Sequence, residues 1–142
     1  MTTNPAIFRA YDIRGHADTE LNHATIDGLG RAIGTLALRG GQTTLVVGRD
    51  GRLSSPRIYQ QLIDALQATG CDVIGIGLVA TPMLYFATHH CGTQAGVMVT
   101  GSHNPSGMNG MKVVLDGQAL SESSIQALRV MIDEDHLAIG AG

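Results

Sequence analysis

A short polar loop holds the residues of this sequence best suited to chemistry. It reads VTGSHNPSGMNGMK from Val99 to Lys112 and follows the apolar run AGVMVT. Glycine and small polar residues allow a loop to turn backbone N–H groups towards an anion. Ser102 has a hydroxyl that can carry a phosphoryl group, and Lys112 can return a positive charge to it. The pattern therefore suggests an anion site.

Three interpretations of Ser102 compete. A Ser-His hydrolase ranks last, because the adjacent side chains of Ser102 and His103 point apart and no G-x-S-x-G motif is present. Ser102 could instead be a loop serine that caps a backbone group, next to a surface histidine. The third interpretation is a phosphoserine that passes its phosphoryl group to a substrate. The residue pattern alone leaves the second and third open.

A cluster of charged side chains follows another apolar run, in the segment TTLVVGRDGR. Arg49, Asp50 and Arg52 lie where a strand is expected to end, so they could face the same site as Ser102. An internal ion pair that holds two loops together is equally plausible. Both interpretations stay open from the sequence.

The cysteines and the paired histidines do not predict a metal site. His89 and His90 are adjacent, so on a helix their side chains point about 100° apart. Cys71 and Cys91 form neither a disulfide framework nor a CxxC motif. Both lie in apolar neighbourhoods, and we predict that both are buried free thiols, as expected in a reducing compartment.

Composition favours one globular domain without nucleic-acid or membrane partners. The chain has 142 residues, of which 44% are hydrophobic and 15% charged, and its net charge is −3. It has no basic block of the kind that binds nucleic acid. No apolar run is long enough to span a membrane, and the N-terminus lacks the apolar core of a signal peptide. We therefore expect a cytoplasmic protein.

Apolar periodicity and turn residues predict an alternation of strands and helices. The expected strands are an extended segment over residues 6–15 and runs over 43–50, 71–77, 95–100 and 111–115. The expected helices are 22–38, ended by Gly40-Gly41, then 55–69, 81–90 and 121–132. Ser55, Thr81 and Ser121 are the predicted N-caps. Glycines inside the first helix imply that something packs close to its face.

This alternation predicts an α/β fold, a three-layer sandwich in which helices flank a mostly parallel mixed sheet. In open α/β sheets, ligands bind beyond the carboxyl ends of the strands, which is where Ser102 lies. The final residues, HLAIGAG, are rich in glycine. We predict a domain over residues 1–136 and the start of an interdomain linker over 137–142.

Several ordered motifs resemble one enzyme family. The segment GVMVTGSHNP (96–105) is similar to the active-site signature of the α-D-phosphohexomutases. FRAYDIRG (8–15) resembles the family's first block, particularly in its bacterial phosphomannomutase/phosphoglucomutase branch. VGRDGRLS (47–54) and GLVATPMLYFA (77–87) also resemble its first domain, in the expected order. Several motifs in order are far more specific than one.

The resemblance implies a phosphoryl relay through Ser102. In this family the matching serine gives its phosphoryl group to a sugar monophosphate, and a bisphosphorylated sugar forms. The sugar turns over within the site and returns its other phosphate to the serine. Phosphate thus moves between the 1- and 6-positions of a hexose such as mannose or glucose. The resemblance also implies Mg²⁺, bound in part through the phosphoryl oxygen on Ser102.

The resemblance further assigns roles to individual positions. His103 matches a histidine that assists proton transfer, and Lys112 matches a general acid/base or charge stabiliser. Arg14 matches an arginine that approaches the phosphoryl group, and Tyr11 matches a tyrosine near the substrate. Without the resemblance these would be a loop histidine, a solvated lysine, an ion pair of Arg14 with Asp12 and a core aromatic. The expected loop-shaping residues are Gly101, Asn104, Pro105, Asn109 and Gly110.

The sequence also departs from the whole family pattern. It has no D-G-D-x-D metal loop, and its one Asp-Gly pair, Asp116-Gly117, lacks the later aspartates. The sugar-reading and phosphate-clamp motifs of the family's later domains are missing as well. The chain therefore looks like domain I without domains II–IV, and we expect little or no mutase activity from it alone. Exposed interdomain surface could promote self-association. The alternative is a non-catalytic module that binds phosphate or a partner.

Overall fold

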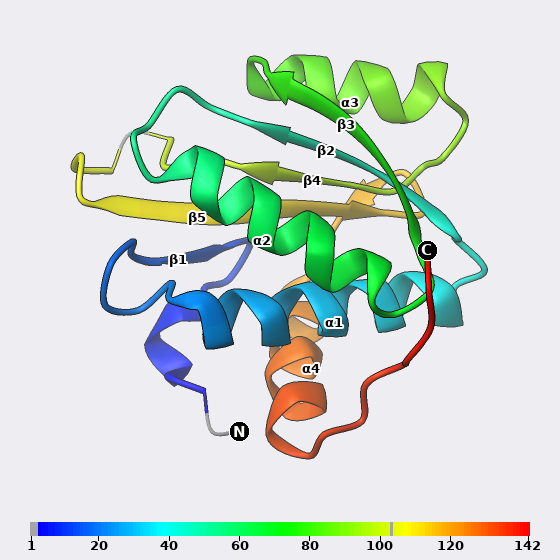
Figure 1. The fold of residues 1–142 in the computed structure, drawn as a ribbon, viewed down its shortest axis with the longest axis horizontal. Coiled ribbons are helices and arrows are strands. Elements are labelled where there is room, and N and C mark those ends of the chain that lie inside the picture. Colours follow the sequence, from blue (N-terminus) through cyan, green and yellow to red (C-terminus); the bar gives the residue numbers. More distant parts are fainter. Residues whose placement is uncertain (1–2, 103) are drawn as a thin grey trace.

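The fold is built on one mixed sheet of six strands, in the order β1-β5-β4-β2-β3 with β6 paired to β5. The computed structural model describes residues 3–102 and 104–142 (Figure 1). The strands are β1 (Ile13–His16), β2 (Thr44–Arg49), β3 (Asp72–Leu78), β4 (Gly96–Val99), β5 (Met108–Leu115) and β6 (Gln118–Ala119). The helices are α1 (His23–Arg39), α2 (Ser55–Gln67), α3 (Thr81–His90) and α4 (Glu122–Asp133), with a short 3-10 helix, η1 (Pro5–Ile7).

Only β5 runs against the other strands of the sheet. β2 pairs in parallel with β3 and β4, whereas β5 pairs antiparallel with β1, β4 and β6. The remaining five strands therefore share one direction. The predicted mostly parallel mixed sheet is confirmed.

Helices cover both faces of the sheet, as the predicted three-layer sandwich requires (Figure 1). The larger core lies between the sheet and helices α1, α2 and α4, and Leu45 and Val47 of β2 point into it. Val46, between them, points to the opposite face and packs with Met98 and with Leu84 of α3. This alternation is the period of two that places successive strand side chains on opposite faces.

Close packing of α1 on α2 and on the turn after it explains two of the three glycines within α1. A Cβ atom at Gly30 would overlap the Ala65 side chain of α2, and one at Gly34 would overlap Thr69, two residues after α2 ends. Replacing either glycine would therefore push the two helices apart. The predicted close neighbour of this helix face is confirmed as α2.

Two predicted strand boundaries and two predicted caps were wrong. Residues 6–15 are not one extended segment, because the 3-10 helix η1, capped by Asn4, precedes a strand of only four residues. β5 begins at Met108, three residues before the predicted start, because its first residues pair with β1. The N-caps of α2 and α3 are Ser54 and Ala80. The predicted capping residues Ser55 and Thr81 are instead the first residues of those helices.

The predicted cap at Ser121 is confirmed, since its side chain accepts a hydrogen bond from the Ser124 N–H.

Cys71 is buried as predicted, but Cys91 is exposed, which corrects the prediction for that residue. Cys91 is the C-cap of α3 and lies beyond its packed part. Among the described residues, no helix is long and apolar enough to cross a membrane.

The last residues of the chain pack beside the end of α2. Gly140 N–H donates to the Ala68 carbonyl at 2.9 Å, and Gly142 N–H donates to the Gln67 carbonyl at 3.0 Å. The Ala138 N–H donates to Thr35 Oγ1 of α1 at 2.8 Å. The predicted boundary between domain and linker at residue 136 stays a prediction.

Candidate active site

Two loops lie side by side at the carboxyl ends of β2 and β4. The first, the Arg52 loop (50–54), leads from β2 into α2; the second, the Ser102 loop (100–107), joins β4 to β5. β2 and β4 are paired up to Arg49 and Val99, and the Asp50 N–H donates to the Val99 carbonyl at 2.9 Å. Both loops therefore leave the sheet at its carboxyl edge, where α/β sheets bind ligands.

Ser102 lies in this edge with an exposed side chain and a left-handed backbone. Its φ angle is 49°, a conformation that is rare for residues other than glycine and that is enriched at active sites. Its N–H donates to Thr100 Oγ1 at 3.0 Å. Ser102 is thus an exposed residue of this turn. His103 lies outside the described residues.

The predicted anion nest is not formed by the N–H groups whose bonds the structure gives. Those of Gly101 and Ser102 donate to Asp50 and Thr100, and those of Asn104 and Met108 donate to carbonyls within the loop. These four N–H groups are therefore engaged within the two loops. This makes the positions of Arg14 and Lys112 important.

Arg14 and Lys112 emerge from the same face of the sheet. Lys112 pairs with Met98, which points towards α3, and Arg14 pairs with Gly110, two residues before Lys112. Side chains two residues apart on a strand share a face. Since α3 packs on β2 and β4, the two cations lie beyond its edge, and both are half-buried. The positive charges of Arg14 and Lys112 thus lie on one face of the sheet, on a part that α3 does not cover.

Arg14 also reaches the Ser102 loop. Its Nη1 lies 3.5 Å from Asn104 Oδ1, while its Nε pairs with Asp12 Oδ2 at 2.8 Å. The ion pair with Asp12, the structural alternative for Arg14, is therefore present. The same pair orients the guanidinium towards the loop, so the two roles are compatible.

Tyr11 and the expected loop-shaping residues fall into different environments. Tyr11 is 80% exposed, which rules out the alternative of a core aromatic. Asn109 and Gly110 lie in β5 and not in the loop, which corrects their predicted position. A Cβ atom at Gly110 would overlap the Ile13 carbonyl. Glycine at position 110 therefore allows β1, the strand that carries Arg14, to lie close to β5.

Asp50 links the two loops. It accepts hydrogen bonds from the Gly101 N–H at 2.9 Å, the Arg52 N–H at 3.1 Å and Ser55 Oγ at 2.5 Å. Burial pushes the pKa of Asp50 up, but the hydrogen bonds from Ser55, Gly101 and Arg52 outweigh it and leave the pKa below 3.8. The carboxylate therefore stays ionised at neutral pH.

Arg52 and Asn109 complete the connection between the loops. Arg52 Nε lies 3.6 Å from Asp50 Oδ2, and its guanidinium donates to carbonyls of the Ser102 loop. The fully buried Asn109 side chain donates to Ser54 Oγ at 2.8 Å and Ser55 Oγ at 2.9 Å. The ion pair that holds two loops, one of the two interpretations of this cluster, is thus confirmed, and it lies at the site.

Arg52 and Asn109 make contacts that the sequence motifs do not predict. Arg49 differs from Arg52, because its guanidinium lies over the Tyr59 ring at 5.9 Å. The signal for Arg52 was its place in the segment GRDGR, but a sequence pattern does not show which carbonyls an arginine reaches.

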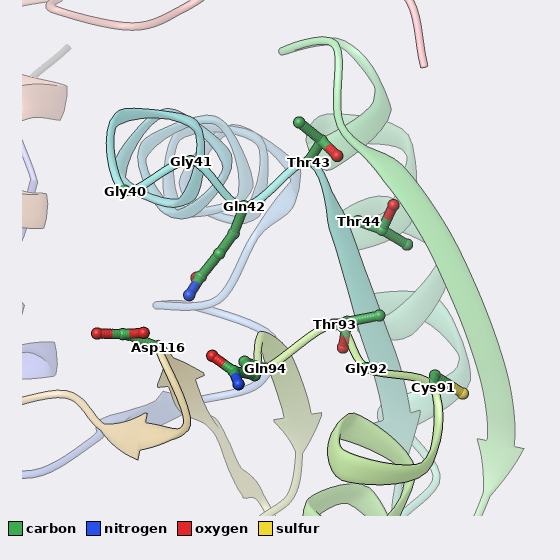
Figure 2. Close-up of a pocket in the computed structure, with 10 residues that line it drawn as sticks. All are labelled: Gly40, Gly41, Gln42, Thr43, Thr44, Cys91, Gly92, Thr93, Gln94 and Asp116. Atoms are coloured by element: carbon green, nitrogen blue, oxygen red, sulfur yellow. The ribbon is translucent and has the colours of Figure 1, made fainter.

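Of two surface pockets, one lies at the two loops and the other lies far from them. One of about 540 Å³ lies between the two loops and is lined by Gly51, Arg52, Leu53, Asn104, Ser106 and Gly107. Another, of about 520 Å³, lies at the opposite end of the sheet and is shown in Figure 2. It lies where β2 begins, and Gln42, Gln94, Asp116 and exposed Cys91 line it. It brings together neither cations nor the Ser102 hydroxyl, so we place the site at the two loops.

The described residues contain no group of three His, Cys, Asp or Glu side chains that could hold a metal ion. Mg²⁺ prefers several oxygen ligands. Of the residues predicted to bind it, this chain offers only the Ser102 oxygen or a phosphoryl group on it. A complete magnesium site is therefore not formed by these residues.

One family model matches nearly the whole chain. Residues 5–138 match the family model described as phosphoglucomutase/phosphomannomutase, alpha/beta/alpha domain I. The chain belongs to this family. Its first-domain motifs and its α/β/α layers are therefore those of a phosphohexomutase domain I, as the sequence motifs predicted.

Individual relatives agree with the family match. The domain is 48% identical to the phosphomannomutase/phosphoglucomutase of Pseudomonas aeruginosa PAO1 over 141 residues. This alignment covers 99% of the chain and 30% of the relative. It is 44% identical to a phosphoglucomutase of Neisseria meningitidis serogroup A, over 91% of this chain and 28% of the relative. The chain thus spans less than a third of the length of these curated relatives.

A solved structure confirms the fold. A phosphoglucomutase/phosphomannomutase family protein from Burkholderia thailandensis superposes with a TM-score of 0.93 and 39% identity. The superposition covers 99% of this chain and 32% of that protein. The domain therefore corresponds to one part of a larger molecule.

Proposed function

We propose that this chain is the phosphoserine-bearing domain of an enzyme that moves phosphate between the 1- and 6-positions of a hexose. The observation that carries the proposal is the exposed hydroxyl of Ser102, which a left-handed backbone presents at the carboxyl edge of the sheet. Arg14 reaches the same loop. The family match and the names of the relatives support a phosphosugar as the substrate.

The transfer would proceed through Ser102 Oγ. When the phosphoryl group leaves, the P–O bond to Ser102 breaks and a P–O bond to a sugar hydroxyl forms. The proton of that hydroxyl passes to a base, for which His103 is the candidate, and the leaving oxygen of Ser102 takes up a proton from a general acid, for which Lys112 is the candidate. The bisphosphorylated sugar then turns over, and its other phosphate returns to Ser102 by the reverse step. Such catalysis depends on position and on charge stabilisation.

Arg14 and Lys112 would supply that charge. The planar guanidinium of Arg14 suits two phosphoryl oxygens at once, and Lys112 adds a second positive charge on the same face. Exposed Tyr11 would contact the substrate. Mg²⁺, when bound, would neutralise charge on the phosphoryl oxygens. One oxygen ligand at Ser102 is not enough to form a metal site. The other ligands of Mg²⁺ would therefore lie outside these residues.

A chimera tests the proposal. This chain would replace the matching 141 residues of the Pseudomonas aeruginosa relative, and conversion of glucose 1-phosphate to glucose 6-phosphate would be measured. We expect the chimera to turn over, the Ser102→Ala chimera to lose activity, and the chain alone to show little or none. Intact mass should show a gain of about 80 Da that Ser102→Ala abolishes.

The competing function is a non-catalytic module that binds phosphate or a partner. It predicts a folded chimera in which Ser102 gains no mass and no hexose phosphate is converted. Activity that survives in the Ser102→Ala chimera would also overturn the proposal, because the phosphoryl group would then travel by another route.

A further inference from the structure

We propose that Arg52 is a positioning residue for phosphoryl transfer, which holds the backbone of the Ser102 loop in the conformation that presents Ser102. This inference rests on the proposed function of Ser102. Arg52 Nη2 donates to the Ser102 carbonyl at 3.0 Å and to the Asn104 carbonyl at 2.6 Å. Its Nη1 donates to the Pro105 carbonyl at 2.6 Å and to the Met108 carbonyl at 3.0 Å.

One guanidinium therefore binds three carbonyls of the Ser102 loop and the carbonyl of Met108, the first residue of β5. The fork of an arginine is planar and rigid, so its N–H groups fix the directions of the carbonyls that they bind. One of these is the carbonyl of Ser102 itself, whose φ angle is 49°. Left-handed backbone at a serine costs free energy and persists only where the surroundings determine it. The bond from Arg52 is one such determinant.

The guanidinium is itself held from behind by Asp50. The carboxylate accepts the N–H of Arg52 and the N–H of Gly101, and its Oδ2 lies 3.6 Å from Arg52 Nε. The Arg52 side chain is only 17% exposed. The carboxylate thus ties the arginine to the residue directly before Ser102, so the two loops behave as one unit.

Gly101 allows this contact. A Cβ atom there would overlap Nε and Cζ of Arg52, so any other residue would force the guanidinium away from the loop. Glycine at this position is explained by the arginine and not by its own backbone angle. Arg52 binds the Ser102 loop through its main chain, whereas Arg14 approaches through the side chain of Asn104.

Arg57 provides a matched control. It also donates to two carbonyls of a neighbouring loop, those of Leu21 at 3.0 Å and Ala17 at 2.7 Å. That loop follows β1, and a bond from the Ala17 N–H to the Gly107 carbonyl at 2.9 Å links it to the far end of the Ser102 loop, but Arg57 takes no part in that bond. Arg57→Gln therefore removes the same kind of contact while the bonds of Arg52 to the Ser102 loop stay in place.

The first measurement is hydrogen exchange of backbone amides in this chain. In Arg52→Gln we expect faster exchange in the peptides that cover residues 101–108 while the exchange of α1 is unchanged. In Arg57→Gln the faster exchange should be confined to the loop of residues 17–22. Unchanged exchange at residues 101–108 in Arg52→Gln would overturn the proposal.

The second measurement is turnover of the chimera with the Pseudomonas aeruginosa relative. A misplaced reacting group can cost about 100-fold in rate, so Arg52→Gln should lower kcat by about that factor with little change in KM. Arg52→Lys should not rescue it, because an ammonium does not span four carbonyls. Equal losses of kcat in the Arg52→Gln and Arg57→Gln chimeras would instead show a general loss of structure and overturn the proposal.

Failure of the proposed function would give a different result. Either the parent chimera would then be inactive and Ser102 would gain no mass, or the Ser102→Ala chimera would remain active, whatever Arg52→Gln does. A loosened loop with normal kcat in the Arg52→Gln chimera, together with an inactive Ser102→Ala chimera, would keep the phosphoserine and refute the positioning role of Arg52.

Discussion

At the scale of single residues, the candidate site combines an exposed serine with a half-buried support. Ser102 faces solvent, while Asp50 and Arg52 behind it are each less than a quarter exposed. The support uses an ion pair and main-chain bonds, and these keep their geometry better than exposed side chains do. A phosphoryl group on Ser102 would thus be held on a fixed backbone.

The sequence was sufficient to predict a role for Ser102 but not to show its support. Motifs around Ser102, Arg14 and Lys112 single out those positions, because the chemistry proposed for them depends on residue type. Which carbonyls Arg52 binds depends on how two loops fold against each other. The exposure of Cys91 was likewise missed, since it depends on where α3 ends and not on its apolar neighbours.

The pKa of Asp50 predicts a pH dependence of stability. Hydrogen bonds in the fold lower this pKa below 3.8, so Asp50 stabilises the fold above the unfolded-state pKa, and this contribution is lost as the pH falls through the folded-state value. We expect Asp50→Asn to be less stable than the parent chain at pH 7. The difference should begin to shrink at about pH 4, where an aspartate of the unfolded chain becomes protonated, and should shrink further as the pH falls through the lower pKa of folded Asp50.

Urea unfolding between pH 3 and pH 7 measures this difference. Asp64→Asn is the matched control, because Asp64 is an exposed carboxylate on α2. Its difference from the parent chain should be small throughout. A penalty for Asp50→Asn that is the same at every pH would contradict the prediction.

At the scale of elements, strands and helices were largely predictable and their ends were not. Apolar periodicity located all four helices and all strands except the two-residue β6. The start of β5 was missed because it depends on pairing with β1, which is distant in sequence. The caps at Ser55 and Thr81 were wrong by one residue. Ser55 Oγ bonds to Asp50, a tertiary contact that competes with capping.

The contact of α1 with α2 gives an element-scale prediction. A Cβ atom at Gly34 would overlap the buried Thr69 side chain, so Gly34→Ala should destabilise the domain by roughly 1–3 kcal/mol, the usual cost of overpacking. Gly40→Ala is the control. A Cβ atom there would lie 3.5 Å from its nearest neighbour, the Ala37 carbonyl, and the φ of Gly40 is −84°.

Chemical denaturation of the two variants measures the free energy of unfolding. We expect a clear loss for Gly34→Ala and a change near zero for Gly40→Ala. Equal effects in the two variants would contradict the prediction, and so would a gain in stability for Gly34→Ala, which the helix preference of alanine alone would produce.

At the scale of the whole molecule, charge is distributed unevenly along the chain. No Asp, Glu, Lys or Arg occurs from Val73 to Met111. This segment contains β3, α3 and β4, so the α3 side of the sheet near the edge strand β3 lacks such charge. Several large apolar side chains are exposed there, namely Leu78 of β3 and Met83 and Phe86 of α3. Such a surface favours association.

This surface predicts that the isolated chain associates with itself at high concentration. The edge strand β3 has one partner in the sheet, β2, and neither Asp, Glu, Lys nor Arg follows its first residue to oppose pairing with another edge. Phe86→Asp adds a charge at a side chain that is 60% exposed, so it should weaken association without unfolding the domain.

Sedimentation velocity over a range of concentrations measures the association. The parent chain should shift towards larger species as concentration rises, and Phe86→Asp should stay closer to the monomer. Val130→Asp is a matched control, because Val130 of α4 is 43% exposed and lies on the other side of the sheet. Association that responds equally to both substitutions would place the contact elsewhere, and a chain that stays monomeric at every concentration would contradict the prediction.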